Sequence, residues 1–581
     1  MNIKSYPVYR RSWILVLLFN LTLCYNATAE IRPVNDAQLH YTQIMFEYDE
    51  VAGANRYTVT ITPVKEPDAK PWVIENRSLA TIVSGFRFGK TYYWHYEAFA
   101  GDKKLFKSEE YRFTIAPHYL VDTNLFSCPL EISKEGKYND DIIFIDYRGI
   151  AINRKGQPVW YYPYRSESVD RDPLFRNLRM TNDGTITFVD DSSCFEVDIN
   201  GKQLWKAPDD GRISGDSKEH YHHDFKKLED GTYLTAGWKY EYEQNLYNPS
   251  LRCQVRYNTL IQYDSKGKIL WHWNEKDHVA REVIYGVYSP SDSVISGTHM
   301  NAFDYDAKEN SIIASCRHNS SIIKIDKKTG NVIYTVGIFD NKKKQQGIEP
   351  LFLHQHGMSI MPDHQFVFYD NYVPDDAANR PITYPRVIVI KEPSKGLPAY
   401  ESWEFECRSP RYPNGIMGKG GYVMPLPNGN LLVCMGGANY AFEVNMSKEI
   451  VWQCDFQKYD PYNRNWIEYI SYRCTSASSL YPYYFTLQQP AKNANGIDFK
   501  INNEGTENDS YQIEITAGDK KINSQTVGIK KQSSQLIHIP LKSKYASREI
   551  VVTVSRMANA AQMKKLLINK PASNLSTSSI Q

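Results

Sequence analysis

The feature that most constrains this chain is a turn followed by an aromatic residue, a pattern that recurs six times between residues 118 and 484. Each unit contains apolar strand-like runs, a turn rich in Asp, Asn or Gly, and an aromatic residue a few positions later. The six aromatic residues are Trp160, Trp205, Trp271, Tyr334, Trp403 and Trp452. Self-similar antiparallel units of this length predict a six-bladed β-propeller with the aromatic residues between the blades.

Alternating strand patterns separated by turn clusters stand on both sides of this repeat. Residues 30–117 contain short runs that alternate apolar and polar side chains, which predicts a small β-sandwich like an immunoglobulin or fibronectin domain. Residues 485–570 alternate in the same way and predict a second small sandwich. The last residues, 571–581, have the Ser- and Asn-rich composition of a disordered tail. The expected fold class is therefore all-β.

The first 29 residues have the pattern of a secretion signal. Three positive charges precede an apolar run at 13–23, and Ala27-Thr28-Ala29 forms a small-residue cleavage site. The run is too short to cross a bilayer, so no membrane insertion of the mature chain is expected. Cleavage after Ala29 is favoured over lipid anchoring at Cys24, because Leu23 stands where a small residue is expected. The N-terminus therefore predicts an exported protein.

Charge and cysteine content exclude several functions. The formal net charge is +2, and removing the three positive residues of the signal leaves a chain close to neutral, which excludes a binder of nucleic acids. The eight cysteines beyond Cys24 form no CxxC pair and match no zinc-site spacing. Most stand in apolar runs, so buried thiols are favoured over disulfides.

Ten of the 14 histidines lie between residues 220 and 364, and three of them share a position in the repeat. His223 stands eight residues before a turn glycine, and His356 stands eight before the equivalent turn position, while His299 fits the same place before a longer turn. The equivalent residues of two other units are Arg176 and Gly421. Because inner strands of a propeller line its channel, these three histidines are expected to meet there, with Asn301 on the same strand face as His299.

Three imidazoles suit either a zinc or copper site or the transfer of a charged group. Arg317 follows Asn301 by 16 residues, which places it on the neighbouring strand. A fixed cation opposes metal binding and suits an oxyanion, to which a guanidinium donates two hydrogen bonds. The residues therefore favour transfer of an anionic group, with no metal and no cofactor.

Specific motifs make the sequence similar to a known family. They are His222-His223-Asp224-Phe225, His299-Met300-Asn301 with Arg317, and Gln355-His356. Together with the signal and the repeat, they resemble the bacterial arylsulfate sulfotransferases, which are periplasmic six-bladed propellers that act without the nucleotide donor PAPS. The resemblance covers about residues 30–484. Segment 336–355 lacks the cysteine pair of enterobacterial members, and Gly421 stands at a position that is threonine in the family.

The resemblance implies a ping-pong reaction between small phenolic sulfates and phenols. His356 would take the sulfuryl group as a sulfohistidine, while Arg317, Asn301 and His299 would bind its oxygens. His223 would protonate the leaving phenoxide and deprotonate the acceptor. The family also implies a homodimer contact through the N-terminal domain.

Two other functions are compatible with the sequence. One is a non-catalytic periplasmic propeller that serves as a binding or scaffold protein, and the other is a lyase or hydrolase with a metal held by the histidines. The roles of His222, His354 and Arg473 stay open, although strand alternation favours packing of His222 between blades. The donor, the acceptor and the function of the C-terminal domain also stay open.

Overall fold

The computed structural model describes most of the chain and confirms the all-β class. The described residues are 31–66, 70–117, 126–147, 149–163, 175–190, 193–372, 384–408, 420–460, 464–468, 471–489, 496–542, 545, 548–560 and 562–568. The predicted signal sequence and the predicted tail at 571–581 lie outside them. The helices of the described residues are short: α2 (Glu275–His278), α3 (Arg281–Tyr285), α4 (Asn341–Gln345) and the 3-10 turn η2 (Gly436–Ala438). None of these helices has the length and apolar character needed to cross a membrane.

Six antiparallel sheets, called the six-sheet region below, occupy the repeat. The first contains β11 (Ile142–Ile145), β12 (Ile150–Ile152) and β13 (Pro158–Tyr161), and the second β14 (Arg176–Met180), β15 (Ile186–Val189), β16 (Cys194–Val197) and β17 (Gln203–Lys206). The third contains β18 (Tyr221–Lys227), β19 (Tyr233–Gln244), β20 (Arg252–Tyr263), β21 (Ile269–Asn274) and the short β22 (Val294–Ile295). The fourth contains β23 (Met300–Asp306), β24 (Ser311–Cys316), β25 (Ser321–Asp326) and β26 (Val332–Gly337).

The last two sheets complete a circular order. The fifth contains β27 (His356–Met361), β28 (Gln365–Asp370), β29 (Arg386–Lys391) and β30 (Tyr400–Glu406), and the sixth β31 (Tyr422–Pro425), β32 (Leu431–Cys434), β33 (Tyr440–Val444), β34 (Ile450–Asp455) and β10 (Leu130–Ser133). Strand β37 (Cys474–Ala477) returns to pair with β11 of the first sheet. The inner strands are neighbours in the order β37, β14, β18, β23, β27, β31, and β31 again contacts β37.

Indole groups join consecutive sheets. The Trp160 indole N–H donates to the Ile199 carbonyl in the turn of the second sheet, and the Trp403 N–H donates to Met446 in the sixth. Trp452 of the sixth sheet donates to Arg154 in the turn of the first sheet. In the third sheet the bond is made by Trp273, two residues after the predicted Trp271. The recurring aromatic residues therefore lie between sheets, and Trp452 links the last sheet to the first.

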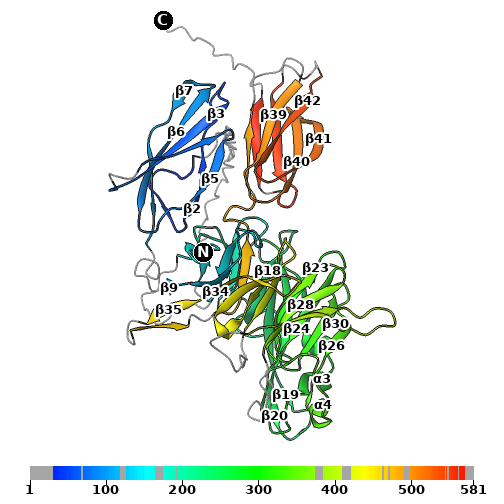
Figure 1. The fold of residues 1–581 in the computed structure, drawn as a ribbon. Helices are drawn as coiled ribbons and strands as arrows, with labels where there is room; N and C mark the ends of the chain where they lie inside the picture. The colour runs from blue at the N-terminus through cyan, green and yellow to red at the C-terminus, as the bar shows by residue number, and fades with distance from the viewer. Residues whose placement is uncertain are drawn as a thin grey trace, which may run out of the picture.

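Two further β units flank this region (Figure 1). The N-terminal unit pairs β1 (Ala37–Leu39), β8 (Tyr111–Ile115), β6 (Thr91–Ala100), β3 (Arg56–Pro63), β4 (Trp72–Asn76) and β7 (Lys103–Lys107), and a second sheet pairs β2 (Gln43–Glu47) with β5 (Ala80–Ser84). The C-terminal unit has one sheet of β38 (Phe485–Gln488), β39 (Gly496–Asn503) and β42 (Ser533–Pro540). Its other sheet contains β41 (Lys520–Ile529), β40 (Asp509–Ala517), β43 (Ile550–Arg556) and β44 (Met563–Ile568). A small separate sheet joins β9 (Phe126–Ser127), β35 (Gln457–Asp460) and β36 (Asn465–Glu468).

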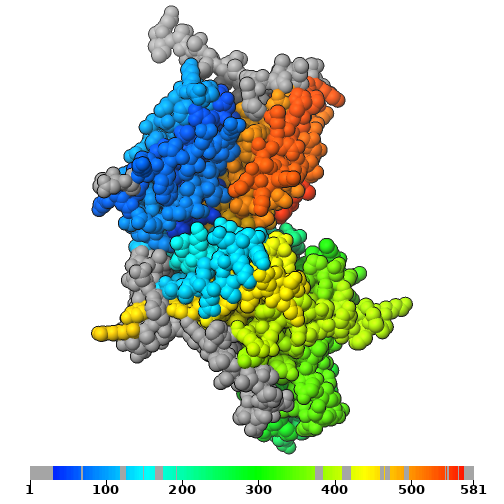
Figure 2. All heavy atoms as spheres, viewed as in Figure 1, coloured from blue at the N-terminus to red at the C-terminus, as the bar shows by residue number. Residues whose placement is uncertain are grey.

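The two flanking units lie side by side on one end of the six-sheet region, as Figure 2 shows in blue and orange. One apolar core runs from the N-terminal sheets, through Trp94 and Phe113, into the first two of the six sheets. The C-terminal unit has a core of its own, shared by its two sheets. Glu504 of this unit accepts a hydrogen bond from Ser78, and Lys564 pairs with the buried Glu47, so the two flanking units contact each other directly.

The eight described cysteines are buried and not bonded to one another as disulfides. This confirms the sequence-based expectation of buried thiols. Burial raises the pKa of thiols such as Cys194 and Cys316, because the thiolate would lose its hydration. The cysteines are therefore buried packing groups.

Candidate active site

The first residues of three inner strands bring the predicted histidines together. His223 lies in β18, His299 immediately precedes β23, and His356 begins β27. The ring centroids of His223 and His299 are 5.1 Å apart. The ring of Tyr472 lies between two of the strands, with its centroid 5.8 Å from that of His223 and 5.8 Å from that of His356. The repeat offset thus identified residues that are neighbours in space.

A β-bulge at the start of these inner strands aims the site residues. Register shifts occur between Tyr221 and Phe225 in β18, between Met300 and Ala302 in β23, and between His356 and Ser359 in β27. Left-handed backbone conformations accompany them, with φ of +54° at His223, +57° at His299 and +52° at Gly357. An extra residue in a strand breaks the alternation of its side chains, and bulges commonly turn a side chain toward a functional site.

His356 is held with one ring nitrogen toward the protein. Its Nδ1 lies 3.0 Å from the His354 carbonyl oxygen and 2.5 Å from Asn371 Oδ1. The Asn371 amide is itself oriented, because its Nδ2 donates to the Gly420 carbonyl at 3.0 Å. A carbonyl oxygen only accepts, so Nδ1 carries the proton and Nε2 presents a lone pair. Burial and the positive charge of Arg317 lower the pKa of His356 to about 3.

His223 is oriented by its sequence neighbour. The Nδ1 atoms of His222 and His223 are 2.9 Å apart, and His222 Nε2 lies 3.0 Å from the Gly237 carbonyl oxygen. His222 also stacks on Trp238, with centroids 4.1 Å apart. Strand alternation favoured packing of His222 away from the site, and the bulge is the reason it contacts both the sheet and His223. Burial and neighbouring His222 hold the pKa of His223 well below its ordinary value.

His299 has a second imidazole against it. The His318 ring stacks on it with centroids 4.5 Å apart, and His318 Nδ1 lies 2.8 Å from the Tyr288 hydroxyl. Burial and the neighbouring His318 imidazole hold the pKa of His299 well below its ordinary value, and burial with the charge of Arg317 lowers the pKa of His318 to about 4. These imidazoles are neutral at physiological pH.

Arg317 and Asn301, the residues predicted to bind oxyanions, contribute to the site in different ways. Arg317 follows β24, its backbone N–H donates to the His299 carbonyl at 2.9 Å, and its charge acts on both His299 and His356. Asn301 lies in the bulge of β23 and is fully buried. Its Nδ2 donates to the Gln355 carbonyl at 2.7 Å, and its Oδ1 has no hydrogen-bond partner among the described residues. Arg317 therefore supplies charge to the site, while Asn301 joins the fourth sheet to the fifth.

Tyr472 and Arg473, which precede β37, complete the site from outside the histidine pattern. Arg473 is fully buried, donates to the Asn301 carbonyl at 2.7 Å and lies 3.1 Å from an Asp224 carboxylate oxygen. Its guanidinium carbon is 5.6 Å from the Tyr472 ring centroid. The Tyr472 hydroxyl is buried without a hydrogen-bond partner among the described residues. Neither residue shares the repeat offset of the histidines, and only circular closure places them beside His223 and His356.

Gly421 occupies its position for steric reasons. Its φ is +113°, and a Cβ there would lie 2.1 Å from the Tyr369 ring. A threonine is excluded by both the backbone conformation and this ring. The site is thus lined at this point by the Tyr369 ring and by Tyr422, whose hydroxyl accepts from Ser359 at 3.2 Å.

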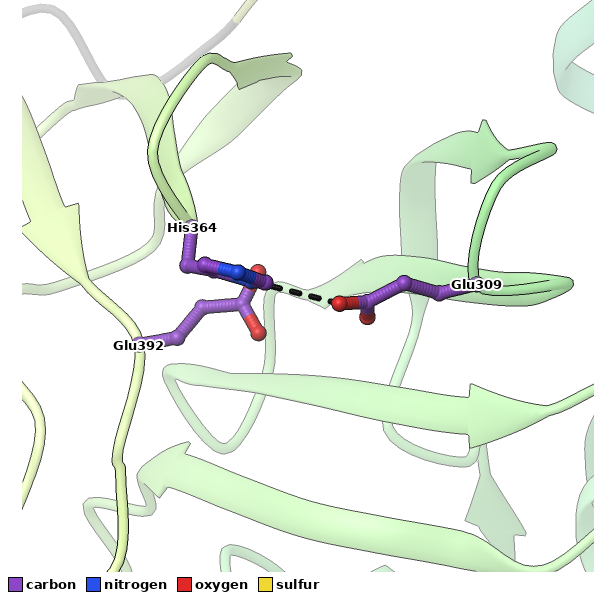
Figure 3. Close-up of side chains that lie close together, drawn as sticks. All are labelled: Glu309, His364 and Glu392. Carbon is purple, nitrogen blue, oxygen red and sulfur yellow. Dashed lines mark ion pairs between the residues drawn. The ribbon is translucent and has the colours of Figure 1, made fainter.

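A separate cluster at the end of the fourth and fifth sheets combines Glu309, His364 and Glu392 (Figure 3). Their ligand atoms lie within 4.8 Å of one another. Lys324 Nζ, however, is 2.5 Å from a Glu309 oxygen and 2.6 Å from a Glu392 oxygen, so an ammonium group already neutralises the carboxylates. The cluster is accounted for as a network of ion pairs.

Comparison with known proteins agrees with this site. The family model of arylsulfotransferases (ASST) matches residues 131–387, a segment that contains all five predicted site residues. Over this segment the match confirms the resemblance to the arylsulfate sulfotransferases that was drawn from the motifs. The family implies a sulfotransferase enzyme with phenolic substrates. The match ends before Gly421 and Tyr472 and includes neither flanking unit.

The other comparisons are distant. The curated proteins contain no match. A crystal structure of a protein of unknown function from Bacteroides caccae is 13% identical with a TM-score of 0.35, and covers 58% of this chain and 99% of that one. Kuenenia stuttgartiensis hydrazine synthase is 12% identical with a TM-score of 0.30, and covers 57% of this chain and 94% of that one. Similarity at this level carries no argument about function.

Proposed function

We propose that the protein is a periplasmic aryl sulfotransferase that moves a sulfuryl group between phenols by a ping-pong reaction through a sulfohistidine on His356. The family match supports aryl sulfotransferase activity in general. The observation that carries the finer proposal is the orientation of His356, whose Nδ1 donates to Asn371 and His354 while its Nε2 presents a lone pair beside the charge of Arg317. The six sheets are the blades of a propeller, and their inner strands surround this site.

In the first half-reaction, His356 Nε2 attacks the sulfur of an aryl sulfate. A bond forms between nitrogen and sulfur, and the bond between sulfur and the phenolic oxygen breaks with its electron pair on the phenoxide. Arg317 stabilises the negative oxygens of the group in flight, since positioning and charge stabilisation do most of the work in such transfers. His299, on which the charge of Arg317 acts, is proposed to bind the same oxygens. Phenoxides leave readily, because the pKa of a phenol is about 10.

In the second half-reaction, a phenol takes the sulfuryl group from His356. Its oxygen attacks the sulfur, its proton goes to His223 Nε2, and the electron pair of the nitrogen–sulfur bond returns to His356. His223 then releases the proton to solvent, which returns the enzyme to its starting state. A neutral imidazole is suited to accept that proton. The aromatic ring of Tyr472, between His223 and His356, offers a face against which a phenol stacks.

The assembly and location proposed for the enzyme follow from its sequence. The signal pattern at residues 1–29 supports export to the periplasm with cleavage after Ala29. The N-terminal unit is proposed as the contact of a homodimer, as in the family. Donor and acceptor are small phenolic compounds, and the reaction draws on no nucleotide sulfate.

Incubation with 4-nitrophenyl sulfate tests this function. The donor alone should release about one nitrophenolate per chain, and intact-protein mass should rise by one sulfuryl group located on His356. Added phenol should convert this burst into steady turnover that survives EDTA. His356→Asn should abolish both burst and turnover. Absence of any release would reject the sulfotransferase, whereas loss of activity with EDTA would favour the metal-dependent reading of the histidines.

A further inference from the structure

Two adjacent histidines in β18 form a directed hydrogen-bond chain. His222 Nε2 faces the Gly237 carbonyl at 3.0 Å, and a carbonyl oxygen only accepts, so this nitrogen carries the His222 proton. His222 Nδ1 then has a lone pair, and the His223 Nδ1 that lies 2.9 Å away must donate to it. We propose that His222 is a positioning residue that fixes the tautomer of His223, so that His223 Nε2 accepts the proton of the acceptor phenol and has none to give to the leaving group.

The environment of His222 makes this chain rigid. The imidazole is buried and stacks on Trp238, with an interplanar angle of 20°. The Gly237 carbonyl belongs to β19, the strand hydrogen-bonded to β18. Because the His222 ring is fixed in this way, its Nδ1 is held toward His223 as firmly as a backbone acceptor would be. The role resembles that of a carboxylate or carbonyl which sets the tautomer of a functional histidine in other sites.

The groups that face His223 favour its neutral form before the acceptor phenol binds. His222 belongs to its own strand, His299 precedes β23, His356 begins β27, and Arg176 begins β14. The carboxylate closest in sequence is that of Asp224. It already pairs with Arg473 and accepts hydrogen bonds from Asn177 and from two backbone N–H groups. A positive charge on His223 would thus lie near that of Arg176 and among further imidazoles, with the Asp224 carboxylate already paired.

This inference rests on the proposed function and gives His223 a different role in each of the two half-reactions. In the first half-reaction the phenoxide leaves unassisted by His223, which selects aryl sulfates of acidic phenols. In the second, the acceptor O–H bond breaks toward His223 Nε2 while sulfur–oxygen bond formation displaces His356. Disturbing His222 should therefore slow only the acceptor step.

Stopped-flow kinetics with 4-nitrophenyl sulfate and phenol test this division. His222→Leu removes the acceptor for His223, whereas His222→Asn keeps an amide oxygen near the former Nδ1. The nitrophenolate burst should stay within about threefold in both variants. The acceptor step of His222→Leu should fall by about 100-fold, the range of general base catalysis, and then rise with pH as phenol ionises. His222→Asn should keep most of the rate and the flat pH profile of the wild type.

His220→Leu is the matched control, since His220 lies two residues earlier, pairs with Asp216 and makes no contact with His223 that the described structure shows. It should change neither half-reaction. Equal slowing of burst and acceptor step in His222→Leu, or loss in His222→Asn as large as in His222→Leu, would overturn the inference and indicate a structural role. A wild-type burst without an acceptor step would overturn it as well.

Nitrogen-15 NMR of the histidine-labelled protein decides the tautomer without any turnover. The wild type should show His223 protonated at Nδ1 and unprotonated at Nε2, assigned by comparison with His223→Gln. His222→Leu should show a mixture of both neutral forms. A wild-type His223 protonated at Nε2 would reject the inference even if the sulfotransferase reaction is observed, and absence of the reaction alone would reject only the proposed function.

Discussion

At the scale of single residues, the site is built from neutral imidazoles placed beside permanent cations. His356 and His223 each use Nδ1 for a hydrogen bond to the protein, which leaves Nε2 of each ring as the nitrogen for the proposed chemistry. Burial lowers their pKa values, and the nearby arginines act in the same direction. Under the proposed function, the same cations would attract an aryl sulfate and keep His356 unprotonated.

The lowered pKa of His356 predicts a pH-dependent stability difference from His356→Gln. The folded pKa of about 3 lies below the unfolded value of 6.5, so the stability associated with neutral His356 is complete above pH 6.5 and is lost as pH falls toward 3. Between pH 6.5 and 4.5 the wild type should lose up to about 1.4 kcal/mol per pH unit relative to the variant. Urea unfolding of both proteins at several pH values measures this, and a difference independent of pH would contradict it.

At the scale of elements, the bulge that opens the inner strands decides what faces the site. Alternation alone would turn His222 away from His223 and would align Asn301 with His299. The bulges in β18 and β23 instead let His222 bond to His223 and direct the Asn301 amide to the next sheet. In the sixth sheet the equivalent position is Gly421, where the Tyr369 ring leaves no space for a side chain.

Gly421→Thr should destabilise this protein. The Cβ would meet the Tyr369 ring at 2.1 Å, and the φ of +113° is strained for any residue other than glycine. The expected loss is about 2–4 kcal/mol in denaturant unfolding. In a double-mutant cycle, Tyr369→Ala should offset part of the loss, with a coupling of about 0.5–3 kcal/mol. Additive effects would show that the ring is not the obstacle.

At the scale of the whole molecule, closure brings the two ends of the repeat to one place. Strand β37 pairs with β11, and Trp452 donates to Arg154 across the same junction. This places Tyr472 and Arg473 against residues from the third to fifth sheets. The C-terminal unit docks nearby through Arg556, which lies 2.5 Å from Asp509 and donates to the Asn182 carbonyl of the second sheet at 2.9 Å.

Arg556→Met should therefore weaken the docking of the C-terminal unit. Arg556 is 1% exposed, and its removal leaves Asp509 as a buried charge without its partner. Loss of one member of a buried pair costs about 3–5 kcal/mol. Calorimetry should show a lower unfolding temperature for the part of the transition that contains this unit. The control Lys521→Met, which breaks an exposed pair with Glu514, should change stability by less than about 1 kcal/mol.

Much of the site was predictable, because a repeat turns sequence position into spatial position. His223, His299 and His356 meet because residues at one offset occupy equivalent places on successive inner strands, and Arg317 follows from the hairpin after His299. The sequence left the role of His222 open, because a bulge changes side-chain direction without any sign in the apolar pattern. The structure shows His222 packed on Trp238 and bonded to His223. Tyr472 and Arg473 lie outside the repeat offset; Tyr472 had no sequence signal, and the role of Arg473 stayed open because only circular closure places it beside Asn301.

By itself, the sequence determined the all-β class, the burial of the cysteines, the family and the group of histidines that meet. These properties depend on local alternation, on periodic spacing and on specific motifs, all of which can be recognised from the order of the residues. The tertiary structure alone decided the tautomers of His223 and His356, the exclusion of a side chain at Gly421 and the contribution of Tyr472 and Arg473. Those depend on contacts between residues far apart in sequence, and such contacts exist only once the strands are paired and the circle of sheets is complete.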